Sequence, residues 1–412
     1  MKYIITDQIK LSHRPEGPLA KYLPSFADFL VSQGYSYWSI LEKVRFSANF
    51  SHWLKQTRTN LHGLKADHVR NYLRYRKRQK KSCSGVACAI ENILDFLRRK
   101  AVLSSQQNVE APPSPVESYL ARYAHYLRED RALAEITISS YIPIIRSFLG
   151  EKFGKKAFNL SRLGPCDVVT FVQHQASFLH KCRSKRMTTA LRSFLNYARY
   201  SGDVTRDLAA AVPSVAYWAM SSIPRAISKD QVNQLLNSIE RNTPLGLRDY
   251  AILLLLARLG LRAGEIVSLE LGGINWSAGI LTVRTKGGRL SNYPLPDEVG
   301  KAIAAYLQNG RPSSPCRNVF LRLNAPITGF RSSSGISCIV RRRLERINIK
   351  TPTKGAHQFR HGFATDMLRQ GASLGEIGDL LGHMHPQTTR IYAKTDLETL
   401  HKLAMPWLGG VL

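Results

Sequence analysis

The residues best suited to chemistry lie near the carboxyl end of the chain, in the stretch HQFRHGFATDMLRQGASLGEIGDLLGHMHPQTTRIYAK (357–394). His357 and Arg360 stand three residues apart, so they share one face of a predicted helix. His383 precedes Tyr392 by nine residues. A tyrosine hydroxyl, with a free pKa near ~10, is a poor nucleophile at neutral pH unless a base or nearby cations assist it. This stretch contains groups of both kinds.

Three further candidates lie upstream of this cluster. Arg262 follows a Gly-Leu break in the sequence LARLGLRAGEIVSLEL, and Glu265 comes one helical turn later. Arginine offers a fixed fork of donors that stays charged, which suits an anionic oxygen. We expect Glu265 to pair with Arg262 and orient it rather than to carry a proton. Lys286 lies 24 residues after Arg262, in a predicted hairpin.

The charge of the chain indicates the partner of this cluster. The 59 Lys and Arg residues outnumber the 29 Asp and Glu residues, giving a net charge of +30. Residues 1–111, 112–223 and 224–412 carry +11, +7 and +12, so the excess is spread along the chain. Such a balance is expected to attract a polyanion, and double-stranded DNA is the predicted partner.

Short basic runs support this prediction. RYRKRQKK (74–81), LHKCRSKR (179–186) and RRRLER (341–346) are expected to contact backbone phosphates, although a solvated face is the alternative for each run. Contacts of this kind position a protein on a nucleic acid without reading its sequence.

Several classes of protein are excluded. The longest apolar run is AILLLLA (251–257), too short to cross a membrane. The first ten residues are too few and too polar for a secretory signal. Six cysteines without a C-x-x-C pair argue against a disulfide framework and a zinc ribbon, and predict reduced thiols in a cytoplasmic protein. Without a phosphate-binding loop or an Asp/Glu metal cluster, we expect no cofactor.

Two boundaries divide the chain. The stretch SSQQNVEAPPSPV (104–116) is polar and proline-rich and is typical of a linker. A second boundary lies within 212–228, where Ser228-x-x-Gln231 forms a capping box that opens a helix. The predicted domains are residues 1–104, 114–210 and 223–412.

The first two domains resemble each other in sequence. An offset of 99 relates their first matching positions, and an offset of 101 relates later ones. The pairs include Leu61 and Leu160, Tyr72 and Phe171, Ile90 and Leu191, and Phe96 and Tyr197. We interpret them as two copies of a small helical bundle.

The third domain combines helices with a small sheet. Its second helix, LRDYAILLLLARLG, is apolar nearly all round and is predicted to be a buried core helix. Two β-branched runs in 276–296 predict an antiparallel hairpin with Pro294 on an edge strand. Ser373-x-x-Glu376 is a second capping box, opening a helix that stops at Gly382. The fold class is mainly α and multidomain: two helical bundles and an α+β domain.

Five motifs in order resemble the active site of the tyrosine recombinase (phage integrase) family. They are GLRAGEI, TKGGRLSNYPL, HQFRH, LLGH and the tyrosine after TTRI. The resemblance covers the third domain in full, and the second domain resembles that family's SAM-like, core-binding helical domain. It implies that the catalytic residues are Arg262, Lys286, His357, Arg360, His383 and Tyr392.

The resemblance also implies a mechanism of DNA breakage and rejoining. The two arginines would neutralise non-bridging phosphate oxygens, and Lys286 would protonate the leaving 5′-oxygen as general acid. His357 would accept the tyrosyl proton, and His383 would donate to a phosphate oxygen. The product would be a 3′-phosphotyrosine and a free 5′-hydroxyl, and two strand exchanges would pass through a Holliday junction without ATP or metal.

An apolar segment after the tyrosine concerns the assembly. Leu397, Leu400 and Leu403 recur at three-residue steps, which indicates a helix that packs either on its own core or on another chain. The resemblance implies docking into a neighbouring subunit of a tetramer on DNA. Accessory recombinases are a further candidate partner. The first domain departs from the family, since many relatives begin near residue 113 of this chain.

Other functions stay open at this point. A type IB topoisomerase would use the same chemistry as a monomer, and a DNA-binding regulator would keep the fold without cutting. A lone tyrosine after an isoleucine is usually a packing residue. His361, one turn after His357, suggests zinc ligands, but no Glu stands between them as in H-E-x-x-H. We interpret His361 as a packing residue or a phosphate contact.

Overall fold

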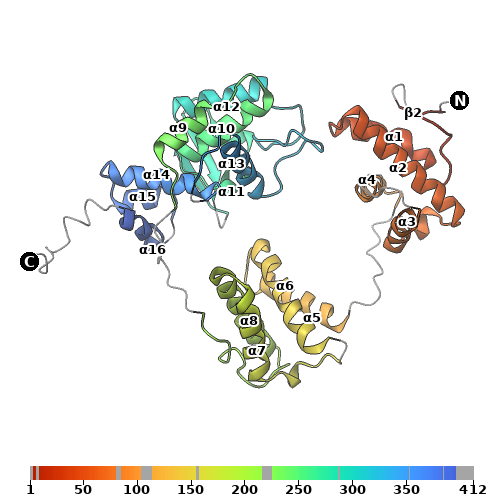
Figure 1. The fold of residues 1–412 in the computed structure, drawn as a ribbon, viewed down its shortest axis with the longest axis horizontal. Helices are drawn as coiled ribbons and strands as arrows, with labels where there is room; N and C mark the ends of the chain where they lie inside the picture. Colours follow the sequence, from red (N-terminus) through yellow and green to blue (C-terminus); the bar gives the residue numbers. More distant parts are fainter. Residues whose placement is uncertain are drawn as a thin grey trace, which may run out of the picture. The chain divides into compact units, whose positions relative to one another are not determined.

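The computed structural model describes residues 3–5, 9–79, 85–103, 114–154, 157–215, 225–285, 288–351, 353–383 and 385–395. It divides into two compact units, residues 1–105 with 222–412, and residues 106–221 (Figure 1). Most of the predicted linker, Lys286 and the segment after Thr395 lie outside the described residues. Within the described ranges, no helix has the length and apolar character needed to traverse a lipid bilayer.

The first bundle has its own apolar core. The apolar positions of α4 recur at helical spacing and are buried, so this helix lies in the core and packs against α1, α2 and α3. The elements are β1 (Tyr3–Ile4), β2 (Lys10–Leu11), η1 (Ala20–Tyr22), α1 (Leu23–Ser32), α2 (Tyr37–Gln56), η2 (Leu61–Gly63), α3 (Ala66–Arg78) and α4 (Val86–Arg99). β1 and β2 pair antiparallel.

The second bundle is built in the same way around a core rich in phenylalanine and tyrosine. Ser114 caps its first helix by accepting a hydrogen bond from the Glu117 amide, and Pro115 occupies the first helical position. The elements are α5 (Pro115–Glu129), α6 (Glu135–Phe153), η3 (Leu160–Arg162), α7 (Pro165–Phe178) and α8 (Lys181–Tyr200).

Both bundles share one element order: two helices, a 3-10 turn, and two more helices. The 3-10 turns begin at Leu61 and Leu160, the first pair related by the offset of 99. The later pairs are buried in both copies. They are Tyr72 with Phe171, Ile90 with Leu191, and Phe96 with Tyr197.

The remaining described residues form the helical region with the small sheet. The elements are α9 (Lys229–Asn237), α10 (Pro244–Arg258), α11 (Ala263–Ser268), η4 (Leu271–Gly273), β3 (Ile274–Asn275), β4 (Ile280–Arg284), β5 (Leu290–Pro294), α12 (Asp297–Asn309), α13 (Ser334–Arg346), α14 (His357–Arg369), α15 (Leu374–Leu380), α16 (Pro386–Thr389) and η5 (Arg390–Thr395). The predicted mainly helical fold with a small antiparallel sheet is confirmed, with strand order β3-β4-β5 and Pro294 on an edge strand.

Helix α10 is the centre of this region. Residues 251–256 are all buried, as expected of a helix that is apolar all round. It packs against α9, α11, α12, α13 and α14. The predicted capping boxes at Ser228 and Ser373 are both formed, each with its serine accepting a hydrogen bond from the amide three residues on.

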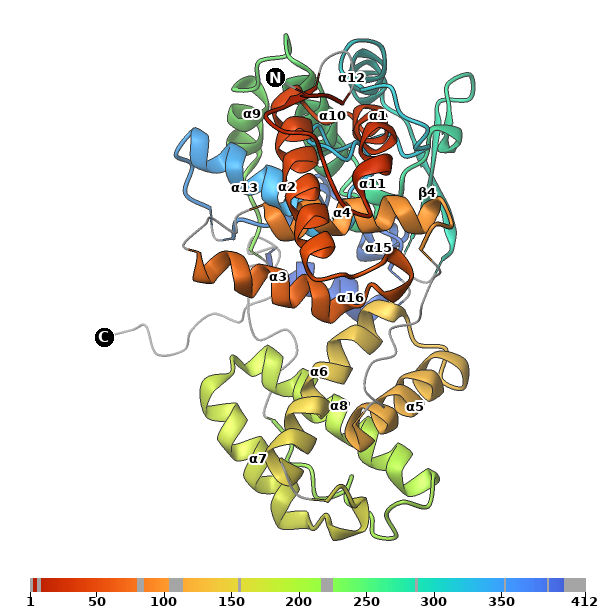
Figure 2. The ribbon, with the colours of Figure 1, turned by 90° about the vertical axis from the view of Figure 1, so that its right-hand side faces the viewer.

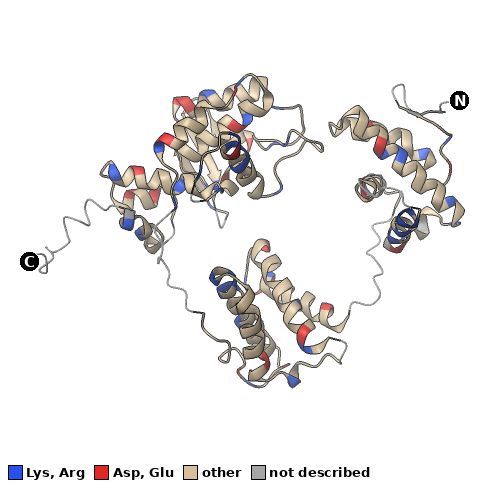
Figure 3. Ribbon diagram, viewed as in Figure 1, with Lys and Arg blue, Asp and Glu red and all other residues tan. Residues whose placement is uncertain are grey.

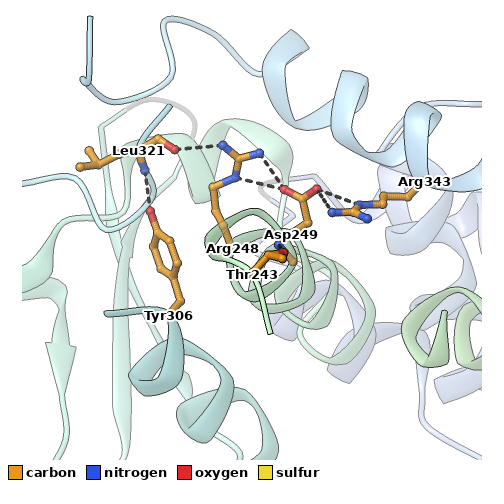
Figure 4. Close-up of polar contacts among 7 residues, drawn as sticks. Thr243, Arg248, Asp249, Tyr306, Leu321 and Arg343 are labelled. Carbon is orange, nitrogen blue, oxygen red and sulfur yellow. Dashed lines mark hydrogen bonds and ion pairs between the residues drawn. The ribbon is translucent and has the colours of Figure 1, made fainter. Parts of the chain in front are cut away.

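A buried ion network ties α10 to α13 (Figure 4). The Asp249 carboxylate accepts from Arg248 Nη2 at 2.8 Å and from Arg343 Nε at 2.8 Å. Arg248 also donates to the Leu321 carbonyl at 3.2 Å. The expectation that Arg343 contacts phosphate is therefore wrong, because its side chain is only 11% exposed and is bound to Asp249. Its neighbours Arg341 and Arg342 are exposed.

Candidate active site

Arg262 is held at the start of α11 by a buried carboxylate. Its Nη1 donates to Glu265 Oε1 at 2.7 Å, and its backbone N–H donates to Glu265 Oε2 at 2.7 Å. The Glu265 side chain is 3% exposed, whereas that of Arg262 is 29% exposed. One carboxylate thus caps the helix and orients a guanidinium whose outer face remains accessible, as predicted for Glu265.

Arg360 lies on the first turns of α14 and is 1% exposed. Its Nη1 donates to the Gly260 carbonyl at 2.9 Å, and its Nη2 donates to the Leu381 carbonyl. Burial, together with the nearby charge of Arg262, lowers the pKa of Arg360 to about 10, so it remains a cation at neutral pH. Two backbone carbonyls therefore fix this side chain between α10 and α15.

Gly260 makes this contact possible. Its φ of +59° lies in the left-handed region that favours glycine. A Cβ here would lie 2.7 Å from the Phe363 side chain and 3.0 Å from that of Leu381. The chain after α10 can turn back towards Arg360 only because this position carries no side chain.

Tyr392 lies on the 3-10 helix η5 and is 2% exposed. Its hydroxyl is 3.2 Å from His361 Nδ1, and the two rings are 5.6 Å apart. Burial raises the pKa of Tyr392, while the positive charges of Arg360 and Arg262 act in the opposite direction. The phenol is therefore neutral at neutral pH. Both guanidiniums are close enough to stabilise its ionised form.

The imidazoles of His361 and His383 lie beside this phenol, that of His357 packs against His361, and all three are held in their neutral form. Burial and the neighbouring positive charges lower the pKa of His361 and of His383 to about 4, and that of His357 below its usual value. The rings of His357 and His361 are 4.5 Å apart, and that of His383 stacks 6.4 Å from Tyr392. A neutral imidazole can accept a proton at one nitrogen while it donates at the other.

Thr389, at the end of α16, contacts both His383 and helix α15. Its buried hydroxyl is 2.8 Å from His383 Nδ1. A Cβ at Gly378 of α15 would lie 3.0 Å from the same hydroxyl oxygen, so α16 packs closely on α15. With Nδ1 engaged, His383 has its Nε2 as the nitrogen available to another group.

An open cavity of about 560 Å³ lies beside part of the candidate active site. Arg262, Glu265 and His357 line it, together with Arg284 and Thr285 at the end of β4. Lys286 itself is outside the described residues. The Thr285 N–H donates to the Arg289 carbonyl at 2.7 Å and closes the hairpin.

Comparisons with known proteins point to one family of enzymes. Residues 225–398 match the model of the phage integrase family. The chain is 51% identical to "Putative integrase/recombinase y4rA" of Sinorhizobium fredii over 409 residues, covering 99% of each chain. It is 30% identical to the tyrosine recombinase XerD of Listeria monocytogenes over 294 residues, covering 69% of this chain and 97% of that protein. The chain belongs to the tyrosine recombinase family.

A solved structure shows the same fold. The XerH site-specific recombinase, in a post-cleavage complex with its palindromic difH substrate, matches at a TM-score of 0.57 and 19% identity, over 82% of this chain and 94% of that one.

The family is one of DNA strand-cleaving and rejoining enzymes, so this tyrosine recombinase is an enzyme of that class whose function is site-specific recombination or integration.

The structure brings together five of the six predicted site residues of this recombinase. These five residues interact through ring contacts or through their charges: Arg262, His357, Arg360, His383 and Tyr392. The sixth, Lys286, is outside the described residues. No group of three His, Cys, Asp or Glu side chains in the described ranges is arranged to hold a metal ion.

The structure adds two residues to the predicted site. His361, interpreted from the sequence as packing or a phosphate contact, is the imidazole at the Tyr392 hydroxyl. Its position one turn after His357 was the available signal. Tyr293 of β5 is the second: its buried hydroxyl has no hydrogen-bond partner in the described structure, and burial and Glu265 raise its pKa. Only the hairpin register could have placed Tyr293 here.

Proposed function

We propose that this chain breaks and rejoins duplex DNA at specific sites through a covalent link between Tyr392 and a 3′-phosphate. The single observation that carries the proposal is the Tyr392 hydroxyl, 3.2 Å from His361 Nδ1 and within the electrostatic reach of Arg262 and Arg360. A phosphodiester requires an oxygen nucleophile, a proton acceptor and cations, and this neighbourhood contains all three.

The steps balance without ATP or a metal ion. The Tyr392 oxygen bonds to phosphorus as the bond to the 5′-oxygen breaks, and its proton leaves to an imidazole. The leaving 5′-oxygen takes a proton and becomes a hydroxyl. A second 5′-hydroxyl attacks the phosphotyrosine in the reverse sense, and two such exchanges pass through a Holliday junction.

The geometry supports a division of roles among the cations. Arg262 lines the cavity, and the buried Arg360 lies close enough to Arg262 for the two charges to interact, so we assign both to the non-bridging phosphate oxygens, where a charged fork of donors binds well. Lys286, which follows Thr285 in the sequence, is assigned as the general acid for the 5′-oxygen.

The geometry also divides the histidines. His361 is assigned as the acceptor of the tyrosyl proton because it contacts the hydroxyl. His357, which lines the cavity with Arg262, is reassigned from proton acceptor to phosphate contact. His383 donates to a phosphate oxygen through the nitrogen that Thr389 does not engage.

The assembly remains part of the proposal. We infer that the enzyme acts on double-stranded DNA as a tetramer in the bacterial cytoplasm, with the segment after Thr395 docked on a neighbouring chain and accessory recombinases as further partners. The net charge of +30 supports the DNA partner.

A library of nicked duplexes tests the chemistry. A nick near the cleavage site lets the short 5′-hydroxyl fragment diffuse away, so the covalent complex accumulates and can be mapped by mass spectrometry. We expect adducts on Tyr392, and none in Tyr392→Phe. Tyr200→Phe removes an exposed tyrosine hydroxyl elsewhere and serves as the matched control. Adducts that persist in Tyr392→Phe would overturn the proposal.

A further inference from the structure

A groove between α2 and α3 of the first bundle has a distinctive lining. Ten residues line its volume of about 480 Å³. They are Arg45, Phe46, Asn49, His52, Trp53 and Gln56 of α2, Tyr72, Tyr75 and Arg76 of α3, and Gln79, which follows α3. None is a carboxylate and none is aliphatic. In Figure 2, α3 runs across α2.

The floor of this groove is formed by aromatic rings that pack together, of which Tyr72 is itself buried. Trp53 lies 5.5 Å from Tyr72 and 6.4 Å from Tyr75, measured between ring centroids. Behind them, the guanidinium of Arg76 lies 5.4 Å from the centre of the Phe46 ring. Tyr75 is 39% exposed, so part of this surface is open to a planar ligand.

The rim of the groove supplies amides and cations. Asn49, Gln56 and Gln79 are exposed, and so is Arg45. Amide and guanidinium side chains form paired hydrogen bonds with the edges of nucleobases, and aromatic rings stack on their faces. The rim and the floor thus complement different parts of the same ligand.

We propose that this groove binds an unstacked nucleotide of DNA, with the base on the aromatic floor and the phosphate at Arg45. An aliphatic helix of a protein partner would find no aliphatic surface here. A contact with the duplex backbone alone needs only exposed cations, and Arg74, Lys77 and Arg78 of α3 supply these outside the groove (Figure 3).

Two carboxylates near the rim do not close the groove. Glu42 lies 3.9 Å from Arg45, and Glu16 lies 3.6 Å from His52. All four side chains are about half exposed or more, and ion pairs of this kind are weak in water. A phosphate can therefore displace either carboxylate.

The second bundle does not repeat this chemistry. The position related to Tyr75 by the offset of 99 is His174, which lies 3.7 Å from the Glu151 carboxylate. Gln175 and Phe178 stand where Arg76 and Gln79 stand in the first bundle. The nucleotide groove is therefore a feature of the first bundle and not of the shared helical frame.

Photo-crosslinking of the full chain tests this inference. The probes carry 5-iododeoxyuridine in a single strand, in a gap within a duplex, or in a fully paired duplex. We expect the single-stranded and gapped probes to crosslink to Trp53 or Tyr75, and Tyr75→Ala to lower the yield about tenfold. Tyr75→Phe keeps the ring and is expected to retain most of the crosslinking.

Matched variants separate the groove from its surroundings. Trp38→Ala removes an aromatic side chain of α2 that is 72% exposed and outside the groove, and it should leave the yield unchanged. Arg45→Ala should weaken binding of the gapped probe more than Arg78→Ala does. Wild-type yield in Tyr75→Ala, crosslinks confined to other segments, or equal yield with the fully paired probe would overturn the inference. Adducts on Tyr392, read separately, report on the proposed chemistry and not on the groove.

Discussion

Arg360 of the candidate active site is 1% exposed, whereas Arg45 of the α2–α3 groove exposes 54% of its side chain. The two aromatic residues differ in the same way: Tyr392 is 2% exposed and Tyr75 is 39% exposed. The candidate active site therefore has its reactive groups fixed before DNA arrives. The groove keeps Arg45 and part of Tyr75 accessible to a ligand, although Tyr72 and Arg76 beneath them are buried.

The two environments also differ in what they cost the fold. A buried guanidinium must be compensated, and Arg360 is compensated by the Gly260 and Leu381 carbonyls. Arg45 remains hydrated and has no such requirement. Substitutions in the candidate active site should therefore change stability and activity together, while those in the groove should change binding alone.

Arg360→Lys is expected to give the largest effect. Lysine cannot bond both carbonyls with a planar fork, so the free energy of unfolding should fall by about 2–4 kcal/mol. Adduct formation should fall about 1,000-fold, because a positioned donor to the phosphate is lost. Urea unfolding and the rate of adduct formation measure the two effects. Arg369→Lys, at an exposed arginine of the same helix, is the control, and an Arg360→Lys protein of wild-type stability would contradict the comparison.

His361→Gln should lower adduct formation about 100-fold, because an acceptor for the tyrosyl proton is lost. His357→Gln tests the division of roles among the histidines, since it leaves the imidazole at the Tyr392 hydroxyl in place. If His357→Gln slowed adduct formation and His361→Gln did not, the proton would pass to His357, as the family resemblance implies.

The sequence predicts candidate site residues and helix caps better than it predicts contacts between distant segments. The five motifs identify Arg262 and Arg360, and the capping boxes at Ser228 and Ser373 are formed as expected. The contact of His361 with Tyr392 depends on how η5 folds back against α14, which no local pattern specifies. The basic run at 341–346 does not predict that Arg343 binds Asp249, because Asp249 is distant in the sequence.

Acid should destabilise the region around the candidate active site. The pKa of His361 and of His383 is about 4 in the folded chain, compared with ~6.5 in an unfolded one. Between these values the unfolded chain binds more protons, so stability should fall as the pH is lowered from about 7 to about 4. Urea unfolding across this range measures the slope. A double variant, His361→Gln with His383→Gln, should flatten it, and an unchanged slope would place the titrating groups elsewhere.

Tyr293→Phe is expected to give the smallest effect, and of the opposite sign. It removes a buried hydroxyl that has no hydrogen-bond partner among the described residues, so stability should stay within about 1 kcal/mol of wild type or rise. Thermal unfolding checks this prediction. A clear loss of stability would show that the hydroxyl is bonded in solution and that the interior of the site is more polar than its hydrogen bonds indicate.

The close packing of α16 on α15 through Thr389 has a consequence for cooperation between chains. It keeps the phenol in the same chain as the guanidiniums that surround it, so cleavage would occur in cis. One chain lacking Tyr392 and another lacking Arg360 would then have no intact centre between them. If the protomers cleave in turn, each active site would have to be regulated separately. One protomer would not supply its tyrosine to the active site of another.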